Sequence, residues 1–479
     1  MLRVLCCVWI MSGILGGVSA QITHQPPAPP ANTPAELLSQ YIQQPSVTGQ
    51  EAGAGRFLSS WCEAQGLQVT VFTDQDSSYN FAASLYPLSD PRPNIVLMHH
   101  MDVVSAADTL AWERPPFAGA YVQDSVWGRG ALDCKGLGTM HLFAMLDFIP
   151  LSRRLPLPYN VTMLAVSGEE VGGMNGSAII VDRYLEALHP AVVFGEGGSG
   201  VQDVVPSHPE IPVFGISVAE KSNLWLKLDL SYPSYSHGAA PPRQYANRAM
   251  LRALYRLNNV KTPYEFTLVN KRMFRELGEL EGGVKGYVLK HINWRIFRPF
   301  VRKYFEEQPL LRALVTNTAI LTNISNPPGP INQISSKVTA YLDCRLLPGT
   351  NRKKFIREIR SGLFEPRFKV TIVDQSPEAP PTPLDEFYEA TSAAIQEVYP
   401  DAAVMPILFP ATTDNNYYRD KSIPTYGIVP ALMTEELIAS IHGPNERIAT
   451  TSLKQGVQVF RKLLAHFLGD PTVVQVDVK

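Results

Sequence analysis

The sequence predicts an α/β protein whose mostly parallel sheet is covered by helices on both faces and interrupted by a smaller inserted α+β unit. Apolar strand-like runs alternate with helical patterns over residues 48–194 and again over residues 385–467, which is typical of a parallel sheet between helical layers. Period-two strands and amphipathic helices occupy the part between them. A chain of 479 residues also exceeds the roughly 250–300 residues that one core serves, so two domains are expected.

Composition and charge exclude several classes of protein. With 45% hydrophobic and 18% charged residues the chain can bury a core, which excludes a disordered chain. The net charge of -2 and the lack of a basic stripe provide no electrostatic footprint for a polyanion. We therefore expect no nucleic-acid partner.

The first twenty residues have the pattern of a secretory signal. Arg3 supplies a positive charge, the stretch from Val4 to Val18 is apolar, and small residues precede the expected cleavage after Ala20. An uncleaved anchor is the less favoured alternative, because the apolar run is shorter than the ~20 residues that span a bilayer. We expect a signal peptide at 1–20, a secreted or periplasmic protein and no membrane span in the mature chain.

A proline-rich spacer at 21–33 should precede the folded region, which we expect to start near Thr33. Two of the five cysteines leave with the signal, and the mature chain keeps Cys62, Cys134 and Cys344. An odd number of cysteines in an exported protein argues against a disulfide framework.

The first part of the chain, 34–220, should form one half of the main sheet. Thr48 and Glu51 have the spacing of a capping box that opens a helix ending at Gln65. Strands are expected at 67–72, 94–104, 160–167 and 191–194, with helices at 134–148 and 173–189. This alternation predicts that the strands lie mostly in parallel.

The second part, 221–375, predicts a two-layer β-α-β-β-α-β unit. Its strands are expected at 223–232, 337–347 and 368–373, and its helices at 244–257 and 351–362. The long segment from Lys261 to Asn326 is rich in aromatic and basic residues such as Trp294. We favour an extra helical hairpin packed on the domain; the alternative is a lid over an apolar substrate or a lipid-facing surface.

A proline-rich break at 377–383 separates this unit from the last part of the chain. There the strand and helix alternation resumes at 385–398, 403–409, 424–429 and 453–467. The second unit is therefore an insertion, and 376–479 completes the domain that 34–220 begins.

Acidic residues and histidines follow the ends of the predicted strands and form a candidate site. Because ligands of open α/β sheets bind outside the carboxyl ends of the strands, one site could collect these side chains. In chain order they are His100, Asp102, Asp133, Glu169, Glu170, Glu196 and His442.

Imidazole and carboxylate ligands together favour zinc or a neighbouring transition metal. Two neutral histidines, three carboxylates and a bridging hydroxide would balance the charge of two divalent cations. Without cations the converging carboxylates would carry a desolvation penalty of several kcal/mol per ion. A single histidine or a glutamate pair at a strand end is usually a solvated loop feature, so the hypothesis rests on the combination.

The two neighbouring glutamates can have different tasks, because successive side chains near a strand end point in different directions. Glu170 can bind metal, while Glu169 accepts a proton from metal-bound water and later delivers it to a departing amine. Asp102 would orient His100 through its second ring nitrogen.

These segments resemble, in order and spacing, the di-zinc peptidase family of acetylornithine deacetylase, succinyl-diaminopimelate desuccinylase, aminoacylase and carboxypeptidase S. The resemblance covers nearly the whole chain after the spacer, and it implies a zinc-peptidase-like catalytic domain with an inserted ferredoxin-like lid or dimerisation domain. The matching stretches are His100-Met-Asp102, Gly128-Arg-Gly-Ala-Leu-Asp133-Cys-Lys135, Gly168-Glu169-Glu170, Glu196-Gly-Gly198 and His442-Gly-Pro-Asn-Glu446.

The resemblance implies a role for each residue of the candidate site. Relatives also have a cis peptide after the bridging aspartate, so one is expected between Asp133 and Cys134. The implied roles are one metal held by His100 and Glu196, a second held by Glu170 and His442, a bridge by Asp133, and general acid and base catalysis by Glu169.

The same resemblance implies a homodimer formed through the lid domain. His237 matches a lid histidine that polarises the scissile carbonyl in the neighbouring subunit, and in a single chain it should lie too far from the metal ligands for contact. Asn332 and Arg345 match lid positions that contact substrate. Asn416 stands where a substrate-binding arginine is expected, which leaves the substrate open.

Two further departures from the family pattern should barely affect the metal site. Gly195 precedes Glu196 where many relatives have aspartate, and Cys134 follows Asp133 where an acidic residue is common.

We therefore expect an exported metallohydrolase that cleaves an amide bond of a small peptide or an N-acyl amino acid with a free carboxylate. Carboxypeptidase or dipeptidase activity is favoured, and aminoacylase activity is the alternative. The expected cofactors are two divalent metal ions, with zinc favoured over cobalt or manganese. A catalytically silent binding protein on the same fold would have lost the base or a metal ligand, and none is lost.

Overall fold

The computed structural model describes residues 31–75, 77–106, 108–233, 236–260 and 262–471. The expected signal peptide at 1–20 and nearly all of the spacer at 21–33 lie outside these residues. Helix α1, Pro34–Ile42, opens the described fold with a capping box in which Thr33 Oγ1 accepts the N–H of Glu36. Among the described residues, no helix is long and apolar enough to cross a bilayer.

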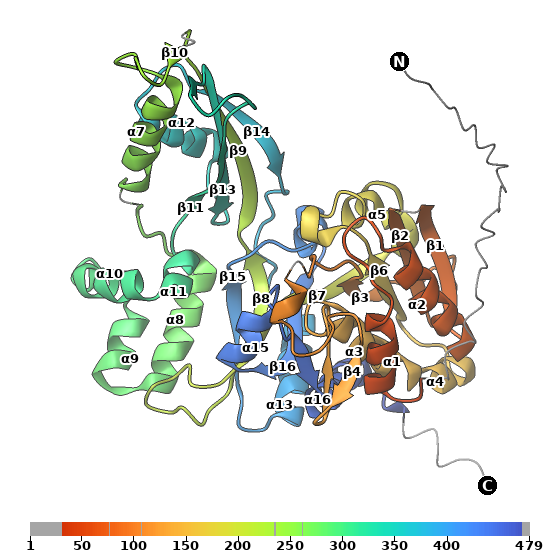
Figure 1. Cartoon of the computed structure of the whole chain (residues 1–479). Coiled ribbons are helices and arrows are strands. Elements are labelled where there is room, and N and C mark those ends of the chain that lie inside the picture. Colours follow the sequence, from red (N-terminus) through yellow and green to blue (C-terminus); the bar gives the residue numbers. More distant parts are fainter. Residues whose placement is uncertain (1–30, 76, 107, 234–235, 261, 472–479) are drawn as a thin grey trace, which may run out of the picture.

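An eight-stranded sheet forms the centre of the larger unit, with the strand order β1-β2-β6-β3-β7-β16-β8-β15 (Figure 1). Four neighbouring pairs, β6–β3, β3–β7, β7–β16 and β8–β15, are parallel, and the others are antiparallel. The predicted α/β class with a mostly parallel sheet is confirmed. The strands are Gln68–Gln75 (β1), Ser78–Ser84 (β2), Asn94–His100 (β3), Asn160–Val166 (β6), Pro190–Val201 (β7), Val213–Glu220 (β8), Ala403–Phe409 (β15) and Thr425–Met433 (β16).

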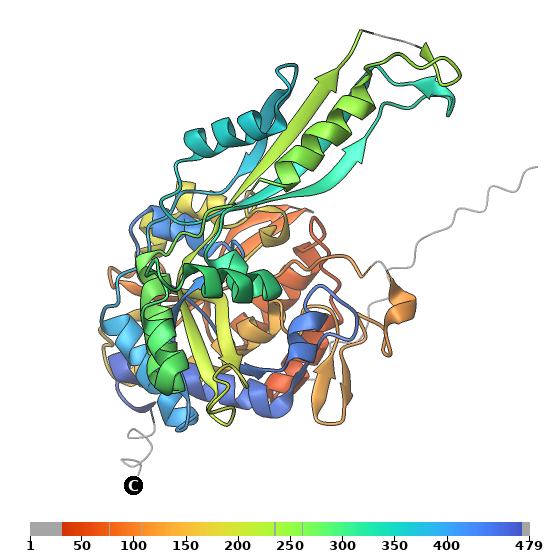
Figure 2. The same ribbon diagram turned by 90° about the vertical axis from the view of Figure 1, so that its left-hand side faces the viewer.

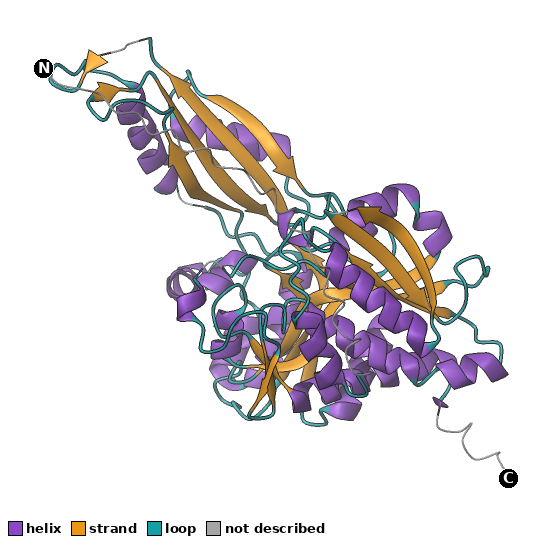
Figure 3. Cartoon of the chain, turned by 45° about the vertical axis from the view of Figure 1, so that its right-hand side comes forward, coloured by secondary structure: helices purple, strands orange, loops and turns teal. Residues whose placement is uncertain are grey.

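Helices cover both faces of this sheet (Figure 3). In β3, Ile95 and Leu97 belong to the core shared with α1, α2, α3, α13 and α16, whereas Val96 and Met98 face the core shared with α5, α6 and α14. Because successive side chains of a strand point to opposite faces of the sheet, one strand contributes to the cores on both sides. The helices are Ala52–Gln65 (α2), Lys135–Leu146 (α3), Ile149–Arg154 (α4), Ser177–Arg183 (α5), Leu185–Leu188 (α6), Glu386–Val398 (α13), Asn415–Asp420 (α14), Glu435–Ser440 (α15) and Thr450–Leu468 (α16).

A four-stranded antiparallel sheet, in the order β11-β13-β9-β14, forms the smaller unit and extends away from the larger one (Figure 2). Alternate residues of β9 and β13, such as Leu226 and Leu342, pack against α7 and α12, and the opposite face carries Trp225 and Arg345. The elements are Ser222–Ser231 (β9), Ala246–Asn258 (α7), Thr318–Ser325 (β11), Lys337–Leu346 (β13), Arg352–Leu363 (α12) and Lys369–Gln375 (β14).

Two smaller sheets complete the strands. One joins β17, β5 and β4 beside the large sheet, and the other joins β10 and β12 at the far end of the smaller unit (Figure 1). Their strands are Ala120–Val122 (β4), Ser125–Trp127 (β5), Ser236–His237 (β10), Gln333–Ile334 (β12) and Arg447–Ala449 (β17).

The long aromatic segment is helical but is longer than the expected hairpin. Its helix α8 packs against β15, and Phe274 and Phe305 share a core with Val213 of β8 and Met405 of β15. The segment therefore packs on the edge of the large sheet, although it interrupts the sequence of the smaller unit. Its helices are Leu268–Glu281 (α8), Gly283–Lys290 (α9), Arg298–Glu307 (α10) and Pro309–Leu314 (α11).

The capping box predicted at Thr48 and Glu51 is wrong. Helix α2 starts at Ala52, and its N-cap Glu51 makes no side-chain cap bond. Thr48 Oγ1 donates instead to Asp102 Oδ2 at 2.9 Å, and Glu51 Oε1 accepts the N–H of Gly49 at 2.9 Å. The buried Asp102 carboxylate has taken the hydroxyl that would have capped the helix.

A buried histidine in α3 should make the fold sensitive to acid. His141 is fully buried against Phe460, and neither ring nitrogen has a hydrogen-bond partner in the described part of the chain. Burial, assisted by the charge of His99, holds the pKa of His141 well below its usual range. The unfolded chain therefore binds a proton below pH ~6.5 that the folded chain does not accept.

We expect His141→Leu to reduce the loss of stability on acidification. In the parent protein this one group lowers the free energy of unfolding by about 1.4 kcal/mol for each pH unit below its unfolded pKa. Urea unfolding of parent and variant between pH 7 and pH 5 measures the difference in slope. A control, His466→Gln, changes an exposed histidine and should keep the parental slope; an unchanged slope in His141→Leu would contradict the prediction.

Candidate metal centre

Five predicted metal ligands come together at the carboxyl end of the large sheet. His100 ends β3, Asp133 lies in the turn before α3, and Glu196 lies within β7. Glu170 belongs to the short 3-10 turn Glu169–Val171 that follows β6, and His442 follows α15. Neighbouring parallel strands end at one edge, so residues far apart in sequence meet there.

Asp133 occupies the centre of this cluster because each of its carboxylate oxygens faces a different histidine. Oδ1 lies 2.9 Å from His100 Nε2, and Oδ2 lies 3.0 Å from His442 Nε2. Glu196 Oε2 lies 3.6 Å from His100 Nε2, and Glu170 Oε2 lies 3.2 Å from His442 Nε2. The site therefore has two halves, one with His100 and Glu196 and one with His442 and Glu170, and Asp133 is shared between them. The Asp133–Cys134 peptide is cis, as expected.

The donor set fits two divalent cations. Burial opposes ionisation of Asp133, but hydrogen bonds from His100 and His442 outweigh it and hold the pKa of Asp133 below its usual range. Hydrogen bonds with Asp133 and Glu170 raise the pKa of His442 to about 10. Positive charge is therefore favoured between these groups, and Glu170 Oε1 is buried without a hydrogen-bond partner among the residues that the structure describes. Bound cations would supply the positive charge and a partner for this oxygen while both imidazoles stay neutral.

Asp102 contacts the second ring nitrogen of His100, as predicted, and the shorter contact is made by its main chain. His100 Nδ1 lies 2.9 Å from the backbone carbonyl of Asp102, while the nearer carboxylate oxygen is 3.6 Å away. The carboxylate accepts the N–H groups of Glu169 at 3.1 Å and Glu170 at 3.2 Å. Asp102 therefore fixes the imidazole through its main chain and the glutamate turn through its side chain.

Glu446 holds the turn that carries Asp133. Its buried carboxylate accepts the backbone N–H groups of Gly130 at 3.0 Å, Leu132 at 2.8 Å and Asp133 at 3.1 Å. Arg129 Nη1 donates to the same carboxylate at 2.7 Å. The role of Glu446 was not predicted. Its place four residues after His442 was the available signal, because the segment that carries one candidate ligand also holds the turn of Asp133.

Glu169 faces the same cavity as the proposed ligands. This cavity has a volume of about 280 Å³, and Asp133, Glu169, Glu170 and Glu196 contribute to its wall. Burial and the charge of Glu196 raise the pKa of Glu169 well above its usual range. A carboxyl group of raised pKa beside metal-binding side chains is suited to taking and giving a proton.

The smaller unit supplies another part of the cavity wall. Arg345 donates through Nε and Nη2 to Asp343 at 2.9 and 3.1 Å and through Nη1 to Thr412 Oγ1 at 3.2 Å. Of the residues called substrate-binding from the sequence, Arg345 lines the cavity. Residues of the wall that were not predicted include Trp225, Phe409, Asp414 and Tyr417.

Asn416, predicted to bind substrate, lies away from the wall of this cavity. It is buried in α14, does not line the cavity, and its Nδ2 has no hydrogen-bond partner in the described residues. Its neighbour Asn415 reaches the site instead, donating through Nδ2 to the backbone carbonyl of Glu196 at 2.7 Å. A Cβ on Gly195 would lie 2.2 Å from Asn415 Oδ1, which explains why glycine precedes Glu196.

Asn332 and His237 lie together at the far end of the smaller unit. Asn332 Nδ2 is 2.9 Å from His237 Nε2, where β10 pairs with β12 (Figure 1). Neither residue lines the cavity that holds the proposed metal ligands. As expected, His237 does not reach the site of its own chain.

Cys134 is closer to the candidate ligands than the sequence suggested. It is fully buried, and its thiol forms a group with His100 and Glu196 that has the spacing of metal ligands. Burial raises the pKa of the Cys134 thiol to about 12. The thiol is therefore adjacent to the candidate ligands, and the expectation that this departure barely affects the metal site stays a prediction.

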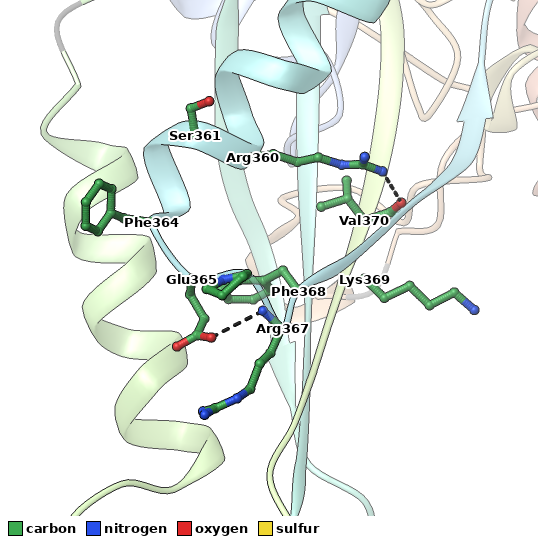
Figure 4. Close-up of a pocket in the computed structure, with 9 residues that line it drawn as sticks. Arg360, Ser361, Phe364, Glu365, Arg367, Phe368, Lys369 and Val370 are labelled. Carbon is green, nitrogen blue, oxygen red and sulfur yellow. Dashed lines mark hydrogen bonds between the residues drawn. The ribbon is translucent and has the colours of Figure 1, made fainter.

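A larger cavity, of about 830 Å³, lies in the smaller unit, and its lining is not suited to binding a metal ion. It is formed where α12 leads into β14 (Figure 4). Its lining contains one carboxylate, Glu365, and no histidine, while Arg360, Arg367 and Lys369 bring positive charge. The smaller cavity at the sheet edge is the one that collects metal-binding side chains.

Comparison with known proteins places this geometry in a family. The model of peptidase family M20/M25/M40 matches residues 96–466. The chain is 25% identical over 405 residues to the probable carboxypeptidase S-like 2 of Dictyostelium discoideum, which covers 83% of this chain and 75% of the relative. It is 25% identical over 376 residues to the N-fatty-acyl-amino acid synthase/hydrolase PM20D1 of Homo sapiens, covering 77% of this chain and 73% of the relative.

Solved structures share the fold. The M20 family metallo-carboxypeptidase Sso-CP2 from Sulfolobus solfataricus has a TM-score of 0.69 at 18% identity, covering 92% of this chain and 100% of that chain. Human carnosine dipeptidase 1 has a TM-score of 0.64 at 15% identity, covering 92% and 96%. Because the family match spans most of the sequence, the chain belongs to peptidase family M20/M25/M40 and is a hydrolase of the metallopeptidase and amidohydrolase type.

Proposed function

We propose that this protein is an exported di-zinc hydrolase that cleaves an amide bond of a small peptide or N-acyl amino acid with a free carboxylate. The observation that carries the proposal is Asp133, whose two oxygens face His100 and His442 while Glu170 and Glu196 flank them. Two divalent cations bound here would supply Lewis acidity and a lowered pKa for water. Zinc is favoured, with cobalt and manganese as alternatives.

Glu169 is the proposed general base and acid. Its carboxylate takes a proton from the attacking water and later delivers it to the departing amine nitrogen. The raised pKa of Glu169 favours the first transfer, because a carboxylate of higher pKa is a stronger base. Asp102 and Glu446 keep the ligand-bearing turns in place through backbone hydrogen bonds.

Arg345 is the proposed anchor of the substrate carboxylate. Asp343 and Thr412 occupy part of its guanidinium, and one N–H on each Nη atom is left for a ligand. Trp225, Phe409 and Ile441 give part of the cavity wall an apolar surface for a side chain or acyl group. The carboxypeptidase S-like relative supports cleavage of peptides, and the N-fatty-acyl-amino acid synthase/hydrolase supports the aminoacylase alternative.

The unit at 221–375 is the proposed lid and dimerisation domain, inserted between 34–220 and 376–479. Its edge strand β11 exposes Ile320, Leu321 and Ile324, and α7 exposes Leu251 and Tyr255. An unpaired apolar edge is a surface that a second copy can cover. In such a homodimer, His237 and Asn332 of one subunit would serve the site of the other. The residues at 1–20 are the proposed signal for export.

We expect Glu169→Gln to lower kcat by roughly 10²–10⁴-fold, because glutamine cannot carry the proton. Metal content, measured by elemental analysis after gel filtration, should stay at two ions for each chain. Loss of an ion from the variant would instead identify Glu169 as a ligand.

We expect Arg345→Ala to raise KM for free-acid substrates by at least ~10-fold, equivalent to about 1.4 kcal/mol. Lys227→Ala, on the same sheet face but outside the cavity wall, is the matched control and should leave KM unchanged. The unmutated protein should also prefer a free-acid substrate to its amidated form. Equal kcat/KM for the two forms would reject carboxylate anchoring.

Subunit complementation tests the role of His237. Glu169→Gln and His237→Ala should each be inactive as pure proteins, and mixing them should restore activity, because a heterodimer contains one site with both residues intact. Exchange of subunits is followed with two affinity tags. No recovery despite exchange would reject action across the dimer.

A further inference from the structure

The thiol of Cys134 lies beside the residues proposed to hold one of the two metal ions. One potential ligand atom each from His100, Cys134 and Glu196 lies within 4.8 Å of the other two. A second group with this spacing among the described residues consists of His100, Asp133 and Glu170. Cys134 is fully buried at the N-cap of α3, so its side chain is held inside the protein.

These donors give the two halves of the centre a different chemical character. His100, Cys134 and Glu196 offer nitrogen, sulfur and oxygen, and zinc binds all three kinds of donor. On the other side, Glu170 and His442 offer oxygen and nitrogen. A thiolate favours soft or borderline ions such as zinc, whereas manganese prefers oxygen ligands.

We propose that Cys134 Sγ is a ligand of the ion held by His100 and Glu196, which makes this metal position softer than the position formed by Glu170 and His442. The inference rests on the proposed metal centre. When the ion binds, the S–H bond is broken, its proton passes to solvent, and sulfur donates an electron pair to the cation without a change of oxidation state.

The charge of the centre is compatible with a thiolate ligand. The carboxylates of Asp133, Glu170 and Glu196 bring three negative charges, and the Cys134 thiolate would bring a fourth. Two divalent cations carry four positive charges, so the thiolate would not leave the protein ligands with an excess of negative charge.

The alternative is that Cys134 only fills space. A buried thiol often behaves as a small apolar side chain, and Cys134 belongs to the main core together with Cys62. The surroundings of the two thiols differ, because the metal-spaced groups in the described part of the chain include Cys134 and leave out Cys62. Cys62 is therefore a matched control for packing.

Cobalt substitution of the full-length protein distinguishes ligation from packing. Visible d–d bands report that cobalt is bound, and a near-ultraviolet thiolate-to-cobalt charge-transfer band reports sulfur ligation. The unmutated protein and Cys62→Ser should both show the charge-transfer band. Cys134→Ser, and Cys134→Ala if the serine variant does not fold, should lose this band and keep visible bands.

The outcomes separate this inference from the proposed function. Visible bands without a charge-transfer band in the unmutated protein would overturn the ligand role of Cys134 and leave the metal centre intact. No cobalt binding at all would overturn the proposed metal centre itself. A charge-transfer band that survives in both Cys134 variants would also reject the inference, because another thiol would be its source.

Metal selectivity gives a second readout that does not depend on catalysis. Changes near metal ligands typically cost about 10–100-fold in affinity, so loss of a direct ligand should lower the preference for cadmium over manganese by at least tenfold. Competition titrations on unmutated protein, Cys62→Ser and Cys134→Ser measure this ratio. An unchanged ratio in Cys134→Ser would contradict the proposed softness of this position.

Discussion

The structure of the site depends on buried carboxylates that bind backbone N–H groups rather than metal. Asp133, Glu170 and Glu196 repel one another when they converge, so the turns that carry them must be held firmly. Asp102 accepts two N–H groups of the glutamate turn, and Glu446 accepts three from the turn before α3. These charge-assisted hydrogen bonds are strong because both carboxylates are buried away from solvent.

The same contacts join segments that are distant in sequence. Asp102 lies two residues after His100, and Glu446 lies four residues after His442, so each carboxylate connects a histidine with the turn of another candidate ligand. Five hydrogen bonds from backbone N–H groups to Asp102 and Glu446 therefore bring the two halves of the site together. Asn415 extends this principle by holding the carbonyl of Glu196, and Gly195 provides the space that Asn415 needs.

Hydrogen bonds connect the smaller unit to the larger one where β8 leads into β9. Thr412 Oγ1 donates to the carbonyl of Lys221 at 2.6 Å and accepts from Arg345, so one hydroxyl connects the two units. Beneath it, Glu220 and Arg419 form a buried ion pair. Arg345 is thus held by Asp343 of its own unit and by Thr412 of the larger unit, which places it at the border between the two.

The sequence by itself determined the fold class, the alternation of most strands and helices, and the candidate ligands, because apolar periodicity and residues at strand ends depend on short spans of chain. Tertiary structure decided the rest. Strand β2 is buried although its Ser78, Asn80 and Ser84 are polar, since their partners come from other segments. The use of Thr48 by Asp102, the exclusion of Asn416 and the approach of Cys134 to His100 likewise depend on long-range neighbours, which a local pattern does not contain.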